Sequence, residues 1–227
     1  MTFTQCDTYR DQFVEIPRLM DEGVRLYNVK DKVLYPSVTS IISFISREKF
    51  ASWRARVGEK EANRKNKHAT TRGTKLHRVF EEYLQNGDYK SLDEYQAPLI
   101  QLMFGSAKSY LDEKLSNIYQ QETNMYSDRL CLAGTVDLIC DVDGELSIVD
   151  FKTSEKAKPE EWLEDYFVQL SAYWAMFSER TGVVPKKLVV FLVAESGEVQ
   201  IVERTNPLDY LKTLRNYVSQ FIQYRNA

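Results

Sequence analysis

Residues 131–154 read CLAGTVDLICDVDGELSIVDFKTS, two apolar runs joined by Asp143-Gly144. This dipeptide is a strong signal for a tight hairpin turn, so the runs 131–140 and 146–153 are predicted to be neighbouring antiparallel strands. The second run is apolar on both faces around Ile148 and Phe151, which is typical of a strand buried in the middle of a sheet. The segment therefore predicts the centre of a sheet.

The regions on either side of this hairpin extend the pattern. Strands are predicted at 117–127, 187–194 and 199–204, and helices at 160–181 and from Asn206-Pro207 to about 224. Strands mixed with long helices in this order predict an α/β fold, with a mixed central sheet flanked by helices.

The N-terminal part has a different pattern. A short hairpin is predicted at 24–36 around Lys30-Asp31-Lys32. Amphipathic or capped helices are predicted after it, at 39–48, 50–65, 70–86 and 91–115. These segments predict a hairpin and helical part over residues 1–90, added to a core over 91–227 within one structural unit.

Composition excludes several classes of protein. The chain has 227 residues, 43% of them hydrophobic and 28% charged, as in ordinary globular proteins. No apolar run reaches the roughly 18 residues that span a bilayer, and the N-terminus lacks a secretory or transit signal, so a cytoplasmic protein is expected. Three widely spaced cysteines (Cys6, Cys131 and Cys140) predict a reducing compartment and fit neither zinc-finger nor iron–sulfur spacing.

Positive charge is concentrated in one segment. Residues 46–78 contain eleven Lys or Arg residues against three acids, although the whole chain has a net charge of −3. Such a segment forms either a solvated helical face or a surface that binds nucleic acid phosphates. Trp53 lies within it and either stacks on a base or, as we favour from the sequence, packs in the core of the helical part.

Three charged residues interrupt the central strands. Asp150 and Lys152 lie two residues apart and therefore point to the same face of their strand, and Asp137 lies on the neighbouring strand. Two adjacent carboxylates repel each other unless a cation lies between them, and oxygen ligands favour Mg²⁺ or Mn²⁺. The alternative is a buried Asp–Lys ion pair with a separate surface aspartate.

Polar residues on two predicted helices complete the pattern. Gln169 and Tyr173 are four residues apart, so they share one edge of the helix that follows the central strands. His77 flanks the apolar stripe of its own helix. Taken alone, His77 is interpreted as a packed or half-exposed histidine, and Gln169 and Tyr173 as ordinary residues at the edge of a helix.

Taken in order, these residues resemble the PD-(D/E)XK nuclease superfamily, and most closely its RecB-type branch. The similarity is greatest to the mitochondrial genome maintenance exonuclease group with its phage and bacterial relatives. It rests on Pro36-Ser37-Val38-Thr39, Arg72-Gly73-Thr74 with His77, Ala133-Gly134-Thr135-Val136-Asp137, and Asp150-Phe151-Lys152-Thr153-Ser154. Branches of the superfamily that hold an iron–sulfur cluster need four cysteines, so no such cluster is expected here.

The resemblance implies a role for each site residue. Asp137 and Asp150 would bind Mg²⁺ or Mn²⁺, with His77 and the Phe151 carbonyl as further ligands, and Lys152 would orient or activate the attacking water. Gln169, Tyr173 and Thr135 would form the wall of the site, Arg72 and Trp53 would contact DNA, and Glu122 is a lower-ranked candidate for the site.

The implied function is a metal-dependent DNA exonuclease that prefers single-stranded ends, because helices of this kind form an arch for single strands in the family. A structure-specific endonuclease with the same site and a catalytically silent nucleic-acid-binding module are the alternatives. The expected setting is bacterial or phage-infected host cytoplasm, with DNA and replication or recombination proteins as partners and no membrane.

Overall fold

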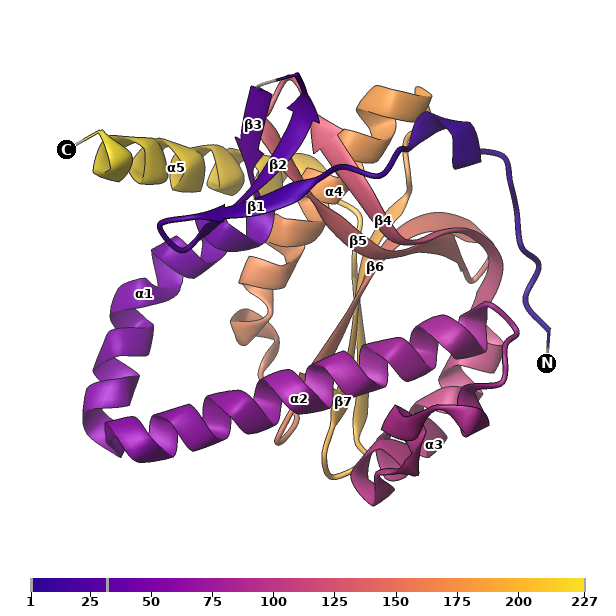
Figure 1. The fold of residues 1–227 in the computed structure, drawn as a ribbon. Helices are drawn as coiled ribbons and strands as arrows, with labels where there is room; N and C mark the ends of the chain where they lie inside the picture. Colours follow the sequence, from indigo (N-terminus) through magenta and orange to yellow (C-terminus); the bar gives the residue numbers. More distant parts are fainter. Residues whose placement is uncertain (1, 32, 227) are drawn as a thin grey trace.

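A five-stranded sheet forms the centre of the molecule (Figure 1). The computed structural model describes residues 2–31 and 33–226. The strands follow the order β4-β5-β6-β7-β8, and only β6 and β7 run parallel. Their bounds are β4 Leu115–Ser127, β5 Leu132–Val142, β6 Glu145–Ser154, β7 Lys187–Ala194 and β8 Val199–Arg204. The predicted α/β class with a mixed central sheet is confirmed.

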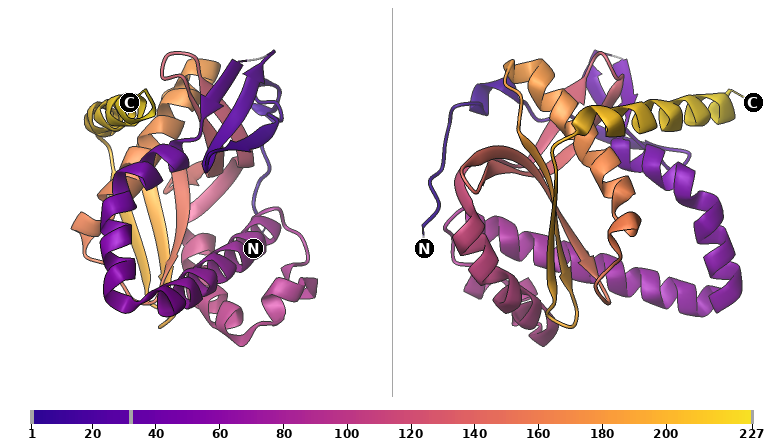
Figure 2. Two further views of the ribbon diagram at one scale, coloured as in Figure 1. Left: turned by 60° about the vertical axis from the view of Figure 1, so that its left-hand side comes forward. Right: turned by 180° about the vertical axis from the view of Figure 1, so that it is seen from behind.

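Helices cover both faces of this sheet (Figure 2). Their bounds are α1 Val38–Val57, α2 Glu59–Leu84, α3 Pro98–Lys114, α4 Glu164–Thr181 and α5 Pro207–Arg225. One buried cluster joins α2 and α3 to the sheet through residues such as Phe80, Phe104 and Phe151. A second cluster joins α1, α4 and α5 to the opposite face, which includes Ile148. Among the described helices, none combines the length and hydrophobicity needed to cross a membrane.

The helix boundaries of the N-terminal part differ from those predicted. Two long helices replace the three predicted over 39–86, and they meet at Gly58 (Figure 1). Gly58 has φ of 85°, which glycine adopts without a steric penalty, so the chain turns there and not at residue 49. The predicted helix 91–115 begins at Pro98, because residues 89–96 form two short 3-10 turns and proline is favoured at the first helical position.

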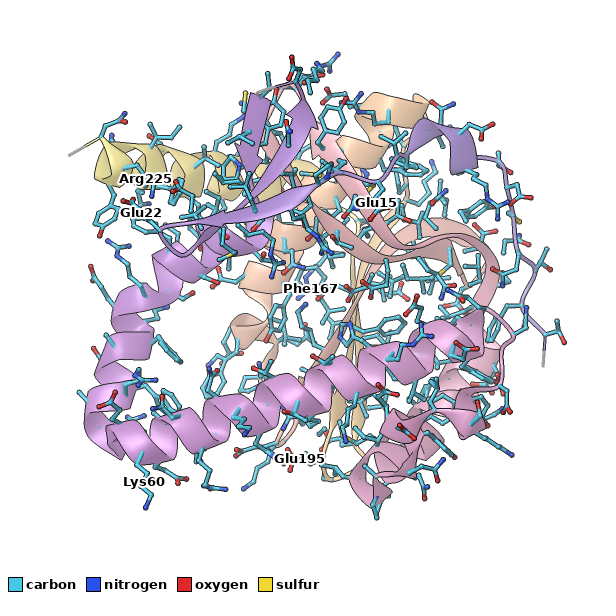
Figure 3. All side chains as sticks on the ribbon, in the orientation of Figure 1. Glu15, Glu22, Lys60, Phe167, Glu195 and Arg225 are labelled. Atoms are coloured by element: carbon cyan, nitrogen blue, oxygen red, sulfur yellow. The ribbon has the colours of Figure 1, made fainter. Side chains whose placement is uncertain are left out.

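Helices α1 and α2 form an arm that projects from the sheet and returns to it. Lys60 lies at the elbow of this arm, far from Phe167 on α4 (Figure 3). Because α2 returns across one face of the sheet, its C-terminal part buries one apolar stripe, made up of Leu76, Val79, Phe80, Tyr83 and Leu84. The arm therefore brings residues of α2 back to the strands that carry Asp137 and Asp150.

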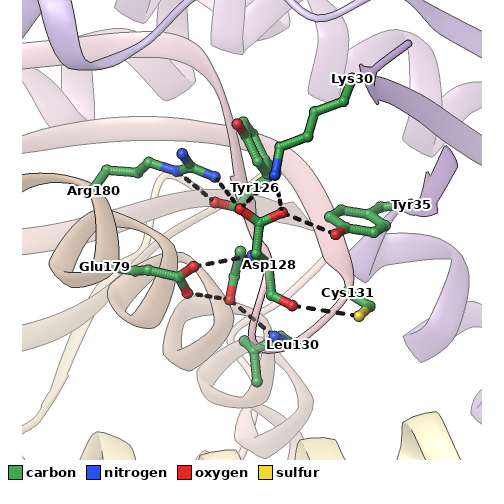
Figure 4. Close-up of polar contacts among 9 residues, drawn as sticks. Lys30, Tyr35, Tyr126, Asp128, Leu130, Cys131, Glu179 and Arg180 are labelled. Atoms are coloured by element: carbon green, nitrogen blue, oxygen red, sulfur yellow. Dashed lines mark hydrogen bonds and ion pairs between the residues drawn. The ribbon is translucent and has the colours of Figure 1, made fainter. Parts of the chain in front are cut away.

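A small sheet of β1 (Arg18–Asp21), β2 (Val24–Lys30) and β3 (Val33–Pro36) packs beside the core. The predicted hairpin at 24–36 is confirmed, with Lys32 of its turn outside the described residues, whereas β1 was not predicted. Asp128 ties the hairpin down by accepting hydrogen bonds from Lys30 (3.0 Å) and Tyr35 (2.9 Å), as Figure 4 shows. The division of the chain at residue 90 stays a prediction.

Candidate active site

The three charged residues of the central strands lie together. Leu138 on β5 is in register with Val149 on β6, and the two strands are antiparallel. Asp137, one residue before Leu138, and Asp150, one residue after Val149, therefore lie next to each other. Asp137 turns one carboxylate oxygen toward the next residue of β6 and accepts a hydrogen bond from the Phe151 amide at 2.8 Å. The short Asp143-Gly144 turn fixes this alignment, because it leaves the two strands no freedom to slip.

Asp137 belongs to a cluster of three potential metal ligands. Atoms Nδ1 of His77, Oε1 of Glu122 and Oδ2 of Asp137 all lie within 4.8 Å of one another. The imidazole nitrogen is 3.7 Å from Asp137 and 3.9 Å from Glu122. The arm delivers His77 to this cluster, whereas Glu122 and Asp137 belong to the sheet.

Glu122 reaches the cluster through an unusual backbone. It lies between the registered pairs Gln121–Leu138 and Thr123–Val136, opposite Asp137, and has φ of 44°. Positive φ is costly for a residue other than glycine and persists where the surrounding structure enforces it, often at functional sites. The β4–β5 pairing therefore holds two carboxylates against each other.

The chemistry of this cluster fits a divalent cation. Two carboxylates with one imidazole form a donor set that suits Mg²⁺ and, with its nitrogen, Mn²⁺. Burial lowers the pKa of His77, but the hydrogen bond that the protonated ring donates to Glu122 and the charge of Asp137 outweigh burial, so the pKa is raised overall. The negative charge that raises the pKa of the imidazole is thus the same charge that would attract a metal cation.

Asp150 and Lys152 form a buried ion pair next to this cluster. Asp150 is 1% exposed, its Oδ1 accepts a hydrogen bond from Gln169 at 2.9 Å, and its Oδ2 contacts the Lys152 ammonium. Within the described part of the chain, no group gives Oδ2 a well-directed hydrogen bond. A buried carboxylate oxygen left in this state can accept a further cation, so Asp150 also fits the predicted ligand set.

The charges of this pair depend on each other. Burial raises the pKa of Asp150 to about 6, although Lys152 opposes the shift. Burial lowers the pKa of Lys152, but Asp150 and Asp137 outweigh burial and raise it overall. The amine therefore stays an ammonium ion and lies 5.0 Å from the centre of the Tyr166 ring.

The predicted wall residues lie beside this pair. Tyr173 is 1% exposed, and burial raises the pKa of its phenol well above the usual value. Its ring packs on Gly134 so closely that a Cβ atom there would lie 2.7 Å from it. The Thr135 hydroxyl donates a hydrogen bond to Asn124 (2.9 Å) and therefore accepts one from the Tyr27 hydroxyl (3.0 Å), so the small N-terminal sheet supports this wall.

Two predicted contacts lie away from the metal ligands. The Arg72 side chain is 4% exposed and pairs with Glu195, which also lies 2.9 Å from His68. Its role as a phosphate contact stays a prediction, although its partner in the structure is a carboxylate. Trp53 is half-buried on α1 and stacks on Phe50 at 5.4 Å, outside the buried clusters of the described residues. The core-packing interpretation of Trp53 does not match this position.

Glu195 and Tyr166 were not predicted from the sequence. Glu195 directly follows β7, which runs parallel to β6, and the carboxyl ends of neighbouring parallel strands meet at one edge of a sheet. That rule was the available signal for Glu195. Nothing in the sequence indicated the contact of Tyr166 with Lys152.

Two open clefts reach the site from different sides. The His77 cleft, of about 880 Å³, is lined by His77, Glu122 and Thr135 together with residues of the N-terminal segment and β4. The Lys152 cleft, of about 1010 Å³, is lined by Lys152, Thr70, the first half of α1, the β1–β2 turn and the end of α5. The site thus borders two clefts that share no lining residue.

Similarity extends to one protein family and to solved structures. The crystal structure of SSO0001 resembles the chain with a TM-score of 0.34 and 19% identity, over 68% of this chain and 75% of that one. No curated protein sequence matches this chain significantly. The model of the family described as the PD-(D/E)XK nuclease superfamily matches residues 50–225, which include His77, Asp137, Asp150 and Lys152. The chain therefore belongs to the PD-(D/E)XK nuclease superfamily.

Proposed function

We propose that this protein is a metal-dependent DNA exonuclease of the RecB-type branch that prefers single-stranded ends. Membership of the superfamily supports the coarser statement, a nuclease that uses a divalent metal. The observation that carries the proposal is the convergence of His77, Glu122 and Asp137 beside the Asp150–Lys152 pair. The site brings together metal ligands and one ammonium ion, and these are the groups that hydrolysis of a phosphodiester requires.

His77, Glu122, Asp137 and Asp150 would hold Mg²⁺ or Mn²⁺. When bound, the ion would lower the pKa of a water molecule and offset negative charge on the scissile phosphate. His77 donates a hydrogen bond to the Phe151 carbonyl through Nε2 (2.9 Å), which turns Nδ1 toward the two carboxylates. The Phe151 carbonyl, predicted as a ligand, thus orients the imidazole in this structure.

Lys152 would act on the phosphate or on the attacking water. Its ammonium is fixed by Asp150 on one side and lies near the Tyr166 ring on the other, so it has little freedom to move. Gln169 donates to the other oxygen of Asp150 and thereby orients the carboxylate. A charge that is already in place costs no reorganisation when negative charge develops on the phosphate oxygens.

The preference for single strands follows from the arm. Helices α1 and α2 carry most of the basic segment 46–78, and the stacked Phe50 and Trp53 rings lie on α1. Aromatic faces among cations are the usual means of binding single-stranded nucleic acid. We therefore assign residues 1–90 to guiding the strand and 91–227 to the nuclease core, with action in the cytoplasm beside replication or recombination proteins.

Strand-labelled substrates test this proposal. Single strands labelled at the 5′ or at the 3′ end, their duplexes and a covalently closed single-stranded circle are incubated with Mg²⁺, with Mn²⁺ or with a chelator. We expect a ladder from the linear strand with either metal, less product from the duplex and none from the circle. Cleavage of the circle would establish an endonuclease, and binding without turnover in either metal would establish a silent module.

A further inference from the structure

The two clefts differ in charge. The His77 cleft is lined by three arginines (Arg10, Arg18 and Arg78) and three glutamates (Glu15, Glu81 and Glu122). The Lys152 cleft is lined by four cations (Arg25, Arg47, Lys152 and Arg225) and one carboxylate, Glu22. A polyanion is attracted to a cleft with excess positive charge, so the charge of the lining residues favours binding in the Lys152 cleft over the His77 cleft.

Two aromatic rings and a cation form a cluster in the Lys152 cleft. The Arg47 guanidinium lies 3.7 Å from the centre of the Phe44 ring and 5.1 Å from that of Tyr224, and the two rings are 4.9 Å apart. Tyr224 is 60% exposed although it is large and mostly apolar. This cluster joins α1 to the end of α5, and the exposed Tyr224 ring offers aromatic surface to a base.

The cations in this cleft differ in how far they are already paired. Arg47 lies 3.7 Å from the exposed Glu48 and donates a hydrogen bond to the Phe44 carbonyl. Arg225 is already paired with Asp21 and Glu22, and Figure 3 shows Glu22 beside Arg225. Arg25 is exposed, and no described residue makes an ion pair or hydrogen bond with its guanidinium. Its backbone is fixed by a hydrogen bond from its amide to the Ser40 hydroxyl (3.0 Å).

We propose that single-stranded DNA lies in the Lys152 cleft and reaches the active site from that side. Arg25 and Arg47 contact its phosphates, and a base stacks on Tyr224. The strand passes between the β1–β2 turn, α1 and α5 toward Lys152, while the His77 cleft lies on the far side of the metal ligands. This inference rests on the proposed function, because it assumes that the bound polyanion is the substrate.

Binding without turnover tests the inference. A fluorescent oligothymidylate of about 12 nucleotides is titrated with protein in EDTA and followed by anisotropy at several salt concentrations. Arg25→Glu and Arg47→Glu should each raise Kd at least about tenfold and reduce the salt slope by about one. Tyr224→Ala should raise Kd by about 5- to 100-fold. Arg215→Glu is the matched control, since Arg215 is exposed on α5 outside both clefts, and should change nothing.

Unchanged binding by Arg25→Glu and Arg47→Glu, or an equal loss in Arg215→Glu, would overturn the inference, as would a wild-type protein that does not bind the oligonucleotide. Equal competition by polyglutamate of matched charge would overturn it as well, because the cleft would then bind any polyanion. Failure of the proposed function looks different: the wild-type protein would bind in this cleft but not cleave with Mg²⁺ or Mn²⁺. Far-ultraviolet spectra confirm that each variant is folded.

Discussion

The Nε2 atom of His77 lies 2.9 Å from the carbonyl oxygen of Phe151, in the middle of β6. A carbonyl oxygen can only accept a hydrogen bond, so this contact places a proton on Nε2 and leaves Nδ1 as the ligand atom of the neutral ring. One backbone group of the central strand thus orients a side chain contributed by the arm. The same residue of β6 orients Asp137 through its amide.

Removal of the imidazole should weaken metal binding. We expect His77→Ala to raise the Kd for Mn²⁺ by at least about tenfold, since even residues that only orient ligands have effects of this size. Calorimetric titration of the protein without DNA measures this directly. His68→Ala is the control, because His68 is on the same helix but contacts Glu195. An unchanged Kd in His77→Ala would exclude His77 from the site.

Lys152 should be needed for cleavage. We expect Lys152→Met to lower kcat/KM by about 10²- to 10³-fold, because a fixed positive charge at the phosphate would be lost, while strand binding stays largely intact. Lys158→Met is a close control, since both ammonium groups lie 5.0 Å from the Tyr166 ring and only Lys152 contacts Asp150. Single-turnover cleavage of a labelled strand measures the effect, and activity within tenfold of wild type would contradict the assigned role.

A methyl group at position 134 should destabilise the protein. The Cβ atom of Gly134→Ala would lie 2.7 Å from Cε1 and 3.0 Å from the hydroxyl oxygen of Tyr173, a ring that is itself buried. Overpacking of this kind costs about 1–3 kcal/mol, which urea denaturation can measure. Gly105→Ala on α3 is the opposite case, because its Cβ meets no atom within 4 Å. We expect it to be neutral or to stabilise by up to about 1 kcal/mol.

Much of the fold could be predicted because its signals are local. Alternation and turn dipeptides placed β7 and β8 at their observed bounds and the other central strands within about two residues. The helices of the arm were misjudged at residue 49 and between 65 and 70, where periodicity weakens. No helix-breaking residue stands there, whereas Gly58 does allow the turn.

The site could be predicted only where sequence proximity implies spatial proximity. Asp137, Asp150 and Lys152 belong to strands joined by a two-residue turn, so their juxtaposition followed from the hairpin. His77 and Glu122 entered through resemblance, because their positions depend on the return of α2 and on an irregular backbone in β4. The Arg72–Glu195 pair and the two clefts join segments far apart in the chain, which no local pattern could indicate.

Asp128 should make stability depend on pH. The hydrogen bond from Lys30 lowers the pKa of Asp128, with further lowering by Tyr35 and Arg180 against the effect of burial. A carboxylate whose pKa is lower in the folded state stabilises the fold above its unfolded pKa of about 3.9, and this contribution is lost as the pH falls through the folded pKa.

We therefore expect Asp128→Asn to unfold at a lower temperature than wild type at pH 7, with the difference shrinking at pH 3. Thermal unfolding followed by circular dichroism at both values measures this. Asp143→Asn, which removes a surface carboxylate paired with Lys114, controls for the general loss of charge. A difference that stays constant from pH 7 to pH 3 would show that the effect does not come from ionisation of Asp128.

Arg72 should stabilise the arm through Glu195. Its buried guanidinium pairs with a residue 123 positions away, in the turn after β7, and its Nε has no partner among the described residues. We expect a double-mutant cycle of Arg72→Met and Glu195→Gln to give a coupling energy of about 1–3 kcal/mol in urea unfolding, as for hydrogen bonds between charged groups.

This pair also bears on the metal site, because Arg72 precedes His77 by five residues on α2. If the pair holds α2 in place, Glu195→Gln should weaken Mn²⁺ binding, but by less than His77→Ala does, since the imidazole is still present. The alternative role of Arg72, direct contact with a DNA phosphate, makes the opposite prediction. Arg72→Met would then weaken strand binding with a coupling energy near zero, and Glu195→Gln, which frees the guanidinium, would strengthen binding.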